Sequence, residues 1–140
     1  MIDFHSETGF KLSNGKSISS WISKVIKAEG FEGGDIAYFF CDDEQVHKLN
    51  LEFLGHNTYT DILSFDYSMG REIHGEIYIS VDRVKENAQT FQTPFEDELH
   101  RVMIHGILHF CGHKDKTEAE QALMREKENK AFSLLSKTTD

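Results

Sequence analysis

The segment that carries most information about the fold of this 140-residue chain is TPFEDELHRVMIHGILHFCG, residues 93–112. Thr93 and Glu96 have the spacing of a capping box, in which side chains bond free backbone N–H groups at the start of a helix. The second half of the segment is apolar on most sides, which is typical of a buried helix. Gly112 permits the left-handed conformation that commonly ends a helix. The sequence therefore predicts a central, buried helix over this segment.

Eight further elements are predicted around this helix from hydrophobic periodicity and turn residues. Strands are expected at residues 2–6, 36–41, 62–67 and 76–81, and helices at 17–29, from a cap at 42 or 43 to 55, from a cap at 82 to about 92, and from 117 to about 135. Two of the strands follow one another with only a short turn between them. The predicted fold class is therefore α+β, with a mixed β-sheet of about four strands flanked by helices.

Composition favours one globular domain over residues 1–140. The hydrophobic content is 39%, with 11 Phe, and 15 basic residues stand against 24 acidic ones, so the net charge is −9. A chain of this size can bury one core. The acidic balance argues against a protein that wraps nucleic acid nonspecifically, which usually carries a basic stripe, but it leaves room for a small basic patch around a site.

Other classes of protein are excluded by simple features of the sequence. No apolar run reaches about 18 residues, so no membrane span is expected. The first ten residues, MIDFHSETGF, lack the basic and apolar regions of a secretory signal. The two cysteines, Cys41 and Cys111, cannot form a disulfide framework, and free thiols are expected. These features together predict a cytoplasmic protein.

The central helix carries two histidines at the spacing that a metal ion needs. His105 and His109 are four residues apart, so their rings point to the same side of the helix. Gly112 then lets the backbone turn back, and Asp115 is placed to supply a third donor. Three protein ligands would leave the fourth position of a tetrahedral zinc site open to water. We therefore expect one divalent metal, most simply Zn²⁺, in a site with hydrolytic chemistry.

Several alternatives remain open at this site. His113 is a rival to Asp115, because histidine is a common ligand, although a helix that stops at Gly112 need not keep His113 on the ligand side. The position after His105 is Gly106, where a zinc peptidase of the H-E-x-x-H type carries its general base. The sequence therefore has the metal spacing of a hydrolase without the base of a peptidase.

Two acidic residues are possible additional members of the site. Asp61 precedes a predicted strand and could either line a cleft or stabilise a turn, and Glu98 lies seven residues before His105, on the same side of the helix, where a solvated carboxylate is the simpler interpretation. The aromatic residues Phe39, Phe40 and Phe53 are expected in the core. The charged segment from Glu126 to Lys130, with Glu128, is expected to be a solvated helix face.

Four separate segments match one known sequence pattern. His105, Gly106, Leu108, His109 and Gly112 match the signature H-G-x-L-H-x-x-G-x-D-H, and further matches are Leu49-Asn50, TDILSF at residues 60–65 and GEIYIS at residues 75–80. On these segments the chain resembles the YbeY family of bacterial rRNA maturation factors. The resemblance implies a mixed sheet flanked by helices, with the metal-binding histidines on the central helix. It also implies a metal-dependent, single-strand-specific endoribonuclease that acts in maturation of the 16S rRNA 3′ end and in ribosome quality control. Its partners would be rRNA and the small ribosomal subunit.

Two departures from the family pattern bear on this interpretation. Asp115 stands where the family has a third histidine, and Leu54 stands where many members have an arginine thought to act at the site. The cations that could compensate are His56, Arg71, Arg101 and Lys114. A non-catalytic ribosome-assembly factor with a structural metal, and a zinc peptidase-like hydrolase, are the alternative functions.

Overall fold

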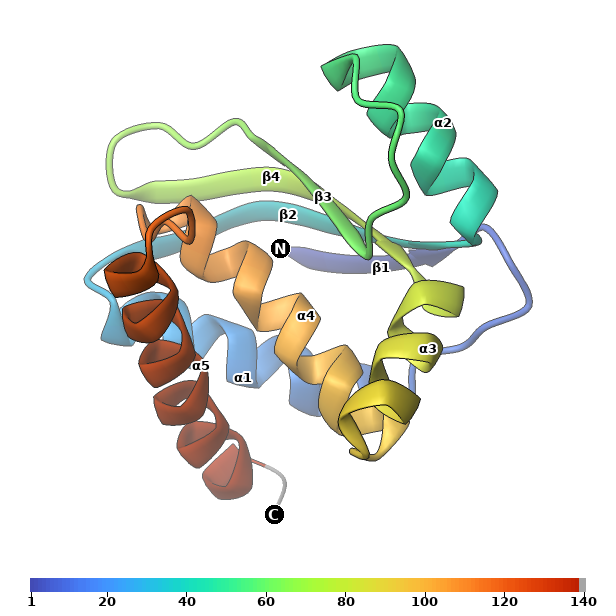
Figure 1. Ribbon diagram of the computed structural model, residues 1–140. Coiled ribbons are helices and arrows are strands. Elements are labelled where there is room, and N and C mark those ends of the chain that lie inside the picture. The colour runs from blue at the N-terminus through green and yellow to red at the C-terminus, as the bar shows by residue number, and fades with distance from the viewer. Residues whose placement is uncertain (139–140) are drawn as a thin grey trace.

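The computed structural model describes residues 1–138, which form four strands and five helices (Figure 1). The strands are β1 (Ile2–Ser6), β2 (Glu32–Cys41), β3 (Ile62–Asp66) and β4 (Glu72–Ser80). The helices are α1 (Gly15–Ala28), α2 (Asp43–Leu54), α3 (Val81–Phe91), α4 (Phe95–Phe110) and α5 (Glu118–Thr138). All nine predicted elements are present, in the predicted order.

The four strands form one mixed sheet in the order β1-β2-β4-β3. β1 and β4 both run parallel to β2, whereas β3 runs antiparallel to β4 along the edge. This confirms the predicted α+β class. β2 and β4 each begin four residues earlier than predicted, because Glu32 pairs with Glu72 and Gly33 with Ile73 before a bulge interrupts the ladder. The glycine-rich start of β2 lacks the apolar pattern that would have revealed this pairing.

The helices are distributed unequally over the two faces of the sheet (Figure 1). α1 and α4 pack on one face, and α5 packs against both of them on the outside. α4 is the buried central helix, as predicted, and it lies close to the sheet because Gly106 has no side chain. A Cβ atom at this position would stand 3.0 Å from Cδ1 of Ile77 and 3.1 Å from Cδ1 of Ile62. Gly106 therefore permits the close approach of the central helix to β3 and β4.

Most predicted helix ends are confirmed, but two predicted caps are wrong. Thr93 does not cap α4: the N-cap residue is Pro94, and no side chain makes a cap hydrogen bond at this helix end. α3 is capped by Ser80, whose hydroxyl accepts from the Arg83 N–H at 3.1 Å. Asp82, the predicted cap, instead accepts from the backbone N–H of Asp43 at 3.0 Å. The Asp82 correction arises because the start of α2 bonds a carboxylate that the local sequence assigns to α3.

The other face of the sheet is covered by α2 at one end only (Figure 1). The small cluster under α2 contains Val46, Cys41 and Leu63. Phe53 of α2, predicted in the core, is 62% exposed, and among the described aromatic residues its ring meets only the edge of Phe65 of β3. Phe40 is buried as predicted, and Phe39 is partly buried.

Two expectations about the whole chain can be compared with the described residues. Both cysteines are free thiols, as expected, and burial raises the pKa of Cys41 to about 11 and of Cys111 to about 12. Within residues 1–138, none of the helices has the length and apolar character required to span a bilayer.

Candidate metal centre

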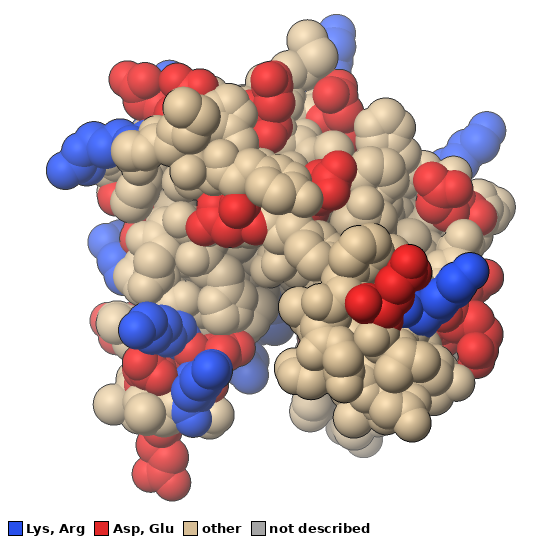
Figure 2. Space-filling model, turned by 90° about the horizontal axis from the view of Figure 1, so that it is seen from above, with Lys and Arg blue, Asp and Glu red and all other residues tan. Residues whose placement is uncertain are grey.

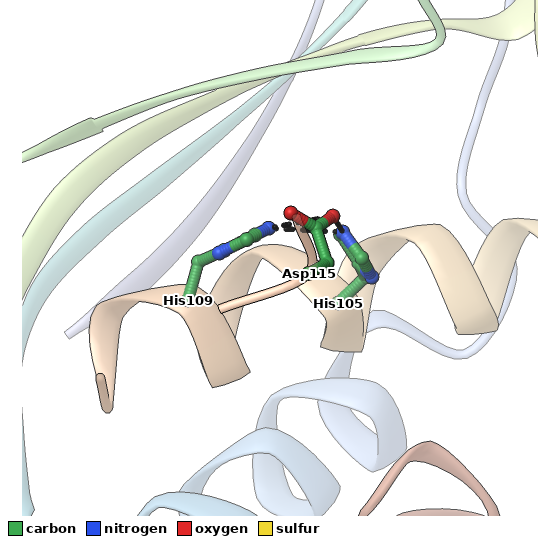
Figure 3. A group of neighbouring side chains, drawn as sticks. All are labelled: His105, His109 and Asp115. Carbon is green, nitrogen blue, oxygen red and sulfur yellow. Dashed lines mark hydrogen bonds and ion pairs between the residues drawn. The ribbon is translucent and has the colours of Figure 1, made fainter. Parts of the chain in front are cut away.

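The centre is built from the last two turns of α4 and the loop that follows them. The helical rise places the rings of His105 and His109 one above the other, with centroids 4.6 Å apart. Gly112, at φ 98°, ends the helix in the left-handed conformation, and the N–H of His113 donates to the carbonyl of Leu108 at 3.0 Å. This turn reverses the chain and brings Asp115 back over the two histidines, as Figure 3 shows.

The three side chains converge on one point. Nε2 of His105 lies 3.0 Å from Nε2 of His109, and Oδ2 of Asp115 lies 3.2 Å from the first nitrogen and 3.3 Å from the second. Ligands of a tetrahedral zinc ion stand about 3.3–3.5 Å from each other, given the usual bond lengths. The donor triangle therefore has the size and the donor types that a single divalent ion requires.

The three donor groups can be reached from solvent. Their side chains are 22%, 30% and 38% exposed for His105, His109 and Asp115. Two hollows flank His105. The first, of about 180 Å³, is the Asp61 hollow, lined by Asp61, Ile62, Glu98, Arg101, Val102, His105, Arg125 and Glu128. The second, of about 270 Å³, is the Asp115 hollow, lined by His105, Asp115, Gln121, Met124, Arg125 and Glu128.

Glu128 of α5 holds the far side of His105. One carboxylate oxygen, Oε2, accepts from Nδ1 of His105 at 2.7 Å, and the other, Oε1, accepts from Nη1 of Arg101 at 2.9 Å. Burial alone would raise the pKa of Glu128, but these two hydrogen bonds outweigh it and lower the pKa. Glu128 is only 4% exposed, so the predicted solvated helix face is wrong at this residue.

The electrostatic balance at His105 follows from the same contacts. Burial alone would lower the pKa of His105, but the hydrogen bond and charge of Glu128, with Asp115 and Asp61 nearby, outweigh it and raise the pKa. In the absence of a cation, these carboxylates therefore favour a positively charged group at His105. A divalent ion held between the donors would compensate the same negative charges.

Comparison with known proteins identifies the family. The family model described as "Endoribonuclease YbeY" matches residues 2–136.

The chain belongs to the YbeY family.

Its relatives include "Endoribonuclease YbeY" from Christiangramia forsetii, which is 56% identical over 133 residues, covering 95% of this chain and 93% of that protein. The protein of the same name from Flavobacterium johnsoniae is 52% identical over 134 residues, covering 96% of each chain. Among solved structures, the solution structure of TM1509 from Thermotoga maritima matches with a TM-score of 0.69 and 29% identity, covering 96% of this chain and 89% of that one. The fold of this YbeY family member is therefore shared by a structure determined in solution.

His113, the alternative third donor, points to a different partner. Its Nε2 lies 2.5 Å from Oε1 of Glu29, at the end of α1, and Lys127 of α5 lies 3.3 Å from the other oxygen of the same carboxylate. Over the described chain, a single set of three or more His, Cys, Asp or Glu side chains has metal-binding spacing, and its members are His105, His109 and Asp115. The structure thus brings Asp115 to the two histidines and places His113 outside the group.

Asp61 and Glu98, the possible additional residues, both line the Asp61 hollow next to His105. Asp61 accepts from Nδ2 of Asn87 at 3.3 Å, and burial raises its pKa. Burial also raises the pKa of Glu98, which is 7% exposed rather than solvated in the first turn of α4. The site therefore contains two carboxyl groups that hold a proton more readily than usual.

Many family members have an arginine at the position of Leu54. In this chain that position is an uncharged side chain, 47% exposed at the end of α2. Of the proposed substitutes His56, Arg71, Arg101 and Lys114, only Arg101 lines a hollow together with His105. Arg101 is already paired with Glu128. Arg71 donates to the carbonyl of Gly30 and lies over the ring of Phe31, away from the centre.

Arg125 is the residue that sequence reasoning missed. It lies on α5 and lines both hollows beside His105. Its guanidinium makes no hydrogen bond or ion pair with any side chain or backbone group of the part of the chain that the structure describes. It lies near enough to Glu98 to lower that residue's otherwise raised pKa. This YbeY family member therefore carries an available arginine at the centre, on a different element from the family position.

Proposed function

We propose that this chain is a metal-dependent endoribonuclease that cuts single-stranded RNA. The observation that carries the proposal is the triangle of donor atoms from His105, His109 and Asp115, with sides of 3.0–3.3 Å and a solvent-accessible side. The family model and the relatives support RNA as the substrate, because each of them carries the name endoribonuclease.

The residues present fit one divalent metal. Two imidazole nitrogens and one carboxylate oxygen suit Zn²⁺, and the carboxylate also admits harder ions. When bound, such an ion acts as a Lewis acid on a phosphate oxygen and makes a nucleophilic water available near neutral pH. His105, His109 and Asp115 would hold this ion, and Glu128 supports His105 from behind.

The remaining residues of the site bind the substrate and move protons. Arg125 is placed to contact a phosphate next to the scissile one, because its guanidinium is unpaired and adjoins both hollows. Asp61 and Glu98 line the hollow at His105 with raised pKa values, which makes them the candidates for holding the proton that the leaving oxygen takes. Catalysis would combine charge stabilisation at the phosphate with this proton transfer.

The biological setting that we propose is rRNA maturation in the cytoplasm, at the 16S rRNA 3′ end, with the small ribosomal subunit as partner. The charge distribution is consistent with substrate presentation by a partner. The net charge is −9, and Asp and Glu lie across the middle of the face shown in Figure 2, whereas Lys and Arg lie mainly toward its edges. Such a surface does not attract free RNA over long distances, so a bound partner would have to bring the strand to the centre.

Both alternative functions lack support in the site. A zinc peptidase of the H-E-x-x-H type needs a general base next to the first histidine, but position 106 is a glycine that faces Ile77 and Ile62 of the sheet. A structural metal site usually has four protein ligands. The donor group in residues 1–138 has three members, and an open side faces the hollows.

The test uses the full-length protein freed of metal with a chelator and then reloaded with Zn²⁺. Single-stranded RNA fragments that span the 16S rRNA 3′ end should be cut by the reloaded wild type, and neither a duplex of the same sequence nor casein should be cut. His105→Ala should abolish cleavage. Equal cleavage by the wild type and by His105→Ala would indicate a contaminating nuclease and would overturn the proposal.

A further inference from the structure

Three side chains form a continuous chain of hydrogen bonds behind the metal centre, from Arg101 through Glu128 to His105. The Arg101–Glu128 and Glu128–His105 contacts are 2.9 and 2.7 Å long. We propose that Glu128 is a positioning residue that fixes His105 in the tautomer with the proton on Nδ1, and thereby presents the lone pair of Nε2 to the metal. This inference rests on the proposed metal site.

The carboxylate of Glu128 is held in one orientation. It is 4% exposed, and each of its oxygens has its own partner. Arg101 is in turn held over the ring of Phe132, with its guanidinium carbon 5.2 Å from the ring centroid. An ionised carboxylate can only accept hydrogen bonds, so the nitrogen of His105 that faces it must carry a proton.

The consequence for the centre follows from the chemistry of imidazole. A neutral histidine has one N–H and one lone pair, so a proton on Nδ1 leaves Nε2 free to act as a ligand. Nε2 of His105 is the atom that lies 3.0 Å from His109 and 3.2 Å from Asp115. Carboxylates that hold a ligand histidine in this way raise its basicity and fix its ring. Glu128 therefore directs the lone pair of neutral His105 toward the other two donor groups.

A single substitution tests this role sharply. In Glu128→Gln, the amide oxygen should face Arg101, because a guanidinium has only donors. The amide NH₂ group is then left facing Nδ1 of His105, which must accept. The proton of His105 should therefore move to Nε2, where it blocks the metal. Glu126→Gln, which removes the same charge from an exposed position of α5, is the matched control.

The first measurement is zinc affinity, determined on the metal-free, full-length protein by competition with a chelating indicator. Glu128→Gln should bind zinc about 10–100-fold more weakly than the wild type. Glu126→Gln should stay within about twofold, because no contact links it to the centre. Wild-type affinity in a folded Glu128→Gln variant would overturn the inference.

The second measurement needs no variant and reads the tautomer directly. Long-range ¹⁵N–¹H spectra of the metal-free wild type, recorded at a pH where the imidazole is neutral, should show His105 with its proton on Nδ1. A proton on Nε2 in the wild type would overturn the inference even if Glu128→Gln failed to fold. If the wild type binds no zinc, the proposed function fails separately. If it binds zinc and cuts RNA while Glu128→Gln does so equally well, only this inference fails.

Discussion

Two histidine–carboxylate pairs adjoin the end of α4 in this molecule, and they differ in which ring nitrogen binds the carboxylate. His105 is bound through Nδ1 to Glu128, which leaves Nε2 among the donor atoms of the centre. His113 is bound through Nε2 to Glu29, and Lys127 completes that ion pair. The first pair joins α4 to α5, and the second joins the loop after α4 to α1 and α5.

The contrast shows why residue type alone does not identify a ligand. Both histidines have a carboxylate partner, buried for His105 and partly buried for His113, and both belong to the segment that carries the metal motif. Only His105 has a second nitrogen within 3.3 Å of other donor atoms. His113 instead anchors the backbone of the loop from which Asp115 projects. We therefore interpret the first pair as preparing a donor atom and the second as holding the loop.

Metal affinity should respond very differently to substitutions in the donor group (His105, His109 and Asp115) and in the loop anchor (His113 with Glu29 and Lys127). Asp115→Ala and His109→Ala should each weaken metal binding by about 100-fold or more, because each removes an atom of the donor triangle. His113→Gln should change it by only a few fold. Elemental analysis after dialysis should find about one equivalent of divalent metal in the wild type and in His113→Gln, and little in the other two. The reverse order for Asp115 and His113 would show that His113 is the third ligand.

Arg125 should affect substrate binding but not metal binding. In Arg125→Gln, KM for a single-stranded RNA should rise by about tenfold, which corresponds to the loss of one charged hydrogen bond to phosphate. Zinc affinity should stay as in the wild type, since Arg125 contacts none of the donors. Lys24→Gln, at an exposed position of α1, is the control for the change in net charge. An unchanged KM in Arg125→Gln, or an equal rise in both variants, would remove Arg125 from the site.

The sequence predicted the centre better than its surroundings. The spacing of His105 and His109 and the turn at Gly112 are local, so their consequences can be derived without knowing the fold. The convergence of Asp115 follows from the same turn. The role of these residues as ligands stays a prediction until metal is measured, but their geometry agrees with it.

Glu128 and Arg125 were missed because their importance depends on how α5 packs. A mixed-charge segment is usually solvated, and Glu128 stands in one with Glu126. One signal was nevertheless present: Glu128 lies four residues after Met124 and three before Ala131, on the face of α5 that is buried. A glutamate in line with apolar residues at helical spacing is one that needs a partner, and Arg101 and His105 supply it.

The predicted starts of two strands and the predicted burial of one aromatic residue were wrong for a related reason. The early starts of β2 and β4 depend on pairing between two segments about 40 residues apart, and neither segment carries an apolar pattern there. Phe53 has the spacing of a core residue, yet it stays 62% exposed beside Phe65. Hydrophobic periodicity predicts which side of a helix faces inward, but not where the neighbouring layer ends.

Substitution of Glu29 in the loop anchor should change the free energy of unfolding more than it changes zinc affinity. Burial alone would raise the pKa of Glu29, but its hydrogen bonds with His113 and Lys127 outweigh burial and lower the pKa from the ordinary value of 4.5. A carboxylate whose pKa is lower in the folded than in the unfolded state stabilises the fold above the unfolded value, and this contribution is lost as the pH falls through the folded value. Glu29→Gln should therefore lower the free energy of unfolding by about 2 kcal/mol at pH 7.

This difference between the wild type and Glu29→Gln should shrink as the pH falls below 4.5, where Glu29 of the unfolded wild type becomes protonated. Chemical denaturation of the metal-free proteins over a pH series measures it, with Glu32→Gln, at an exposed position, as the control. Zinc affinity of Glu29→Gln at pH 7 should fall by less than about threefold, far less than for Glu128→Gln. If the two variants lost zinc affinity equally, the anchor would be setting the position of Asp115 as strictly as Glu128 sets His105. The two histidine–carboxylate pairs would then act on the metal centre as one unit.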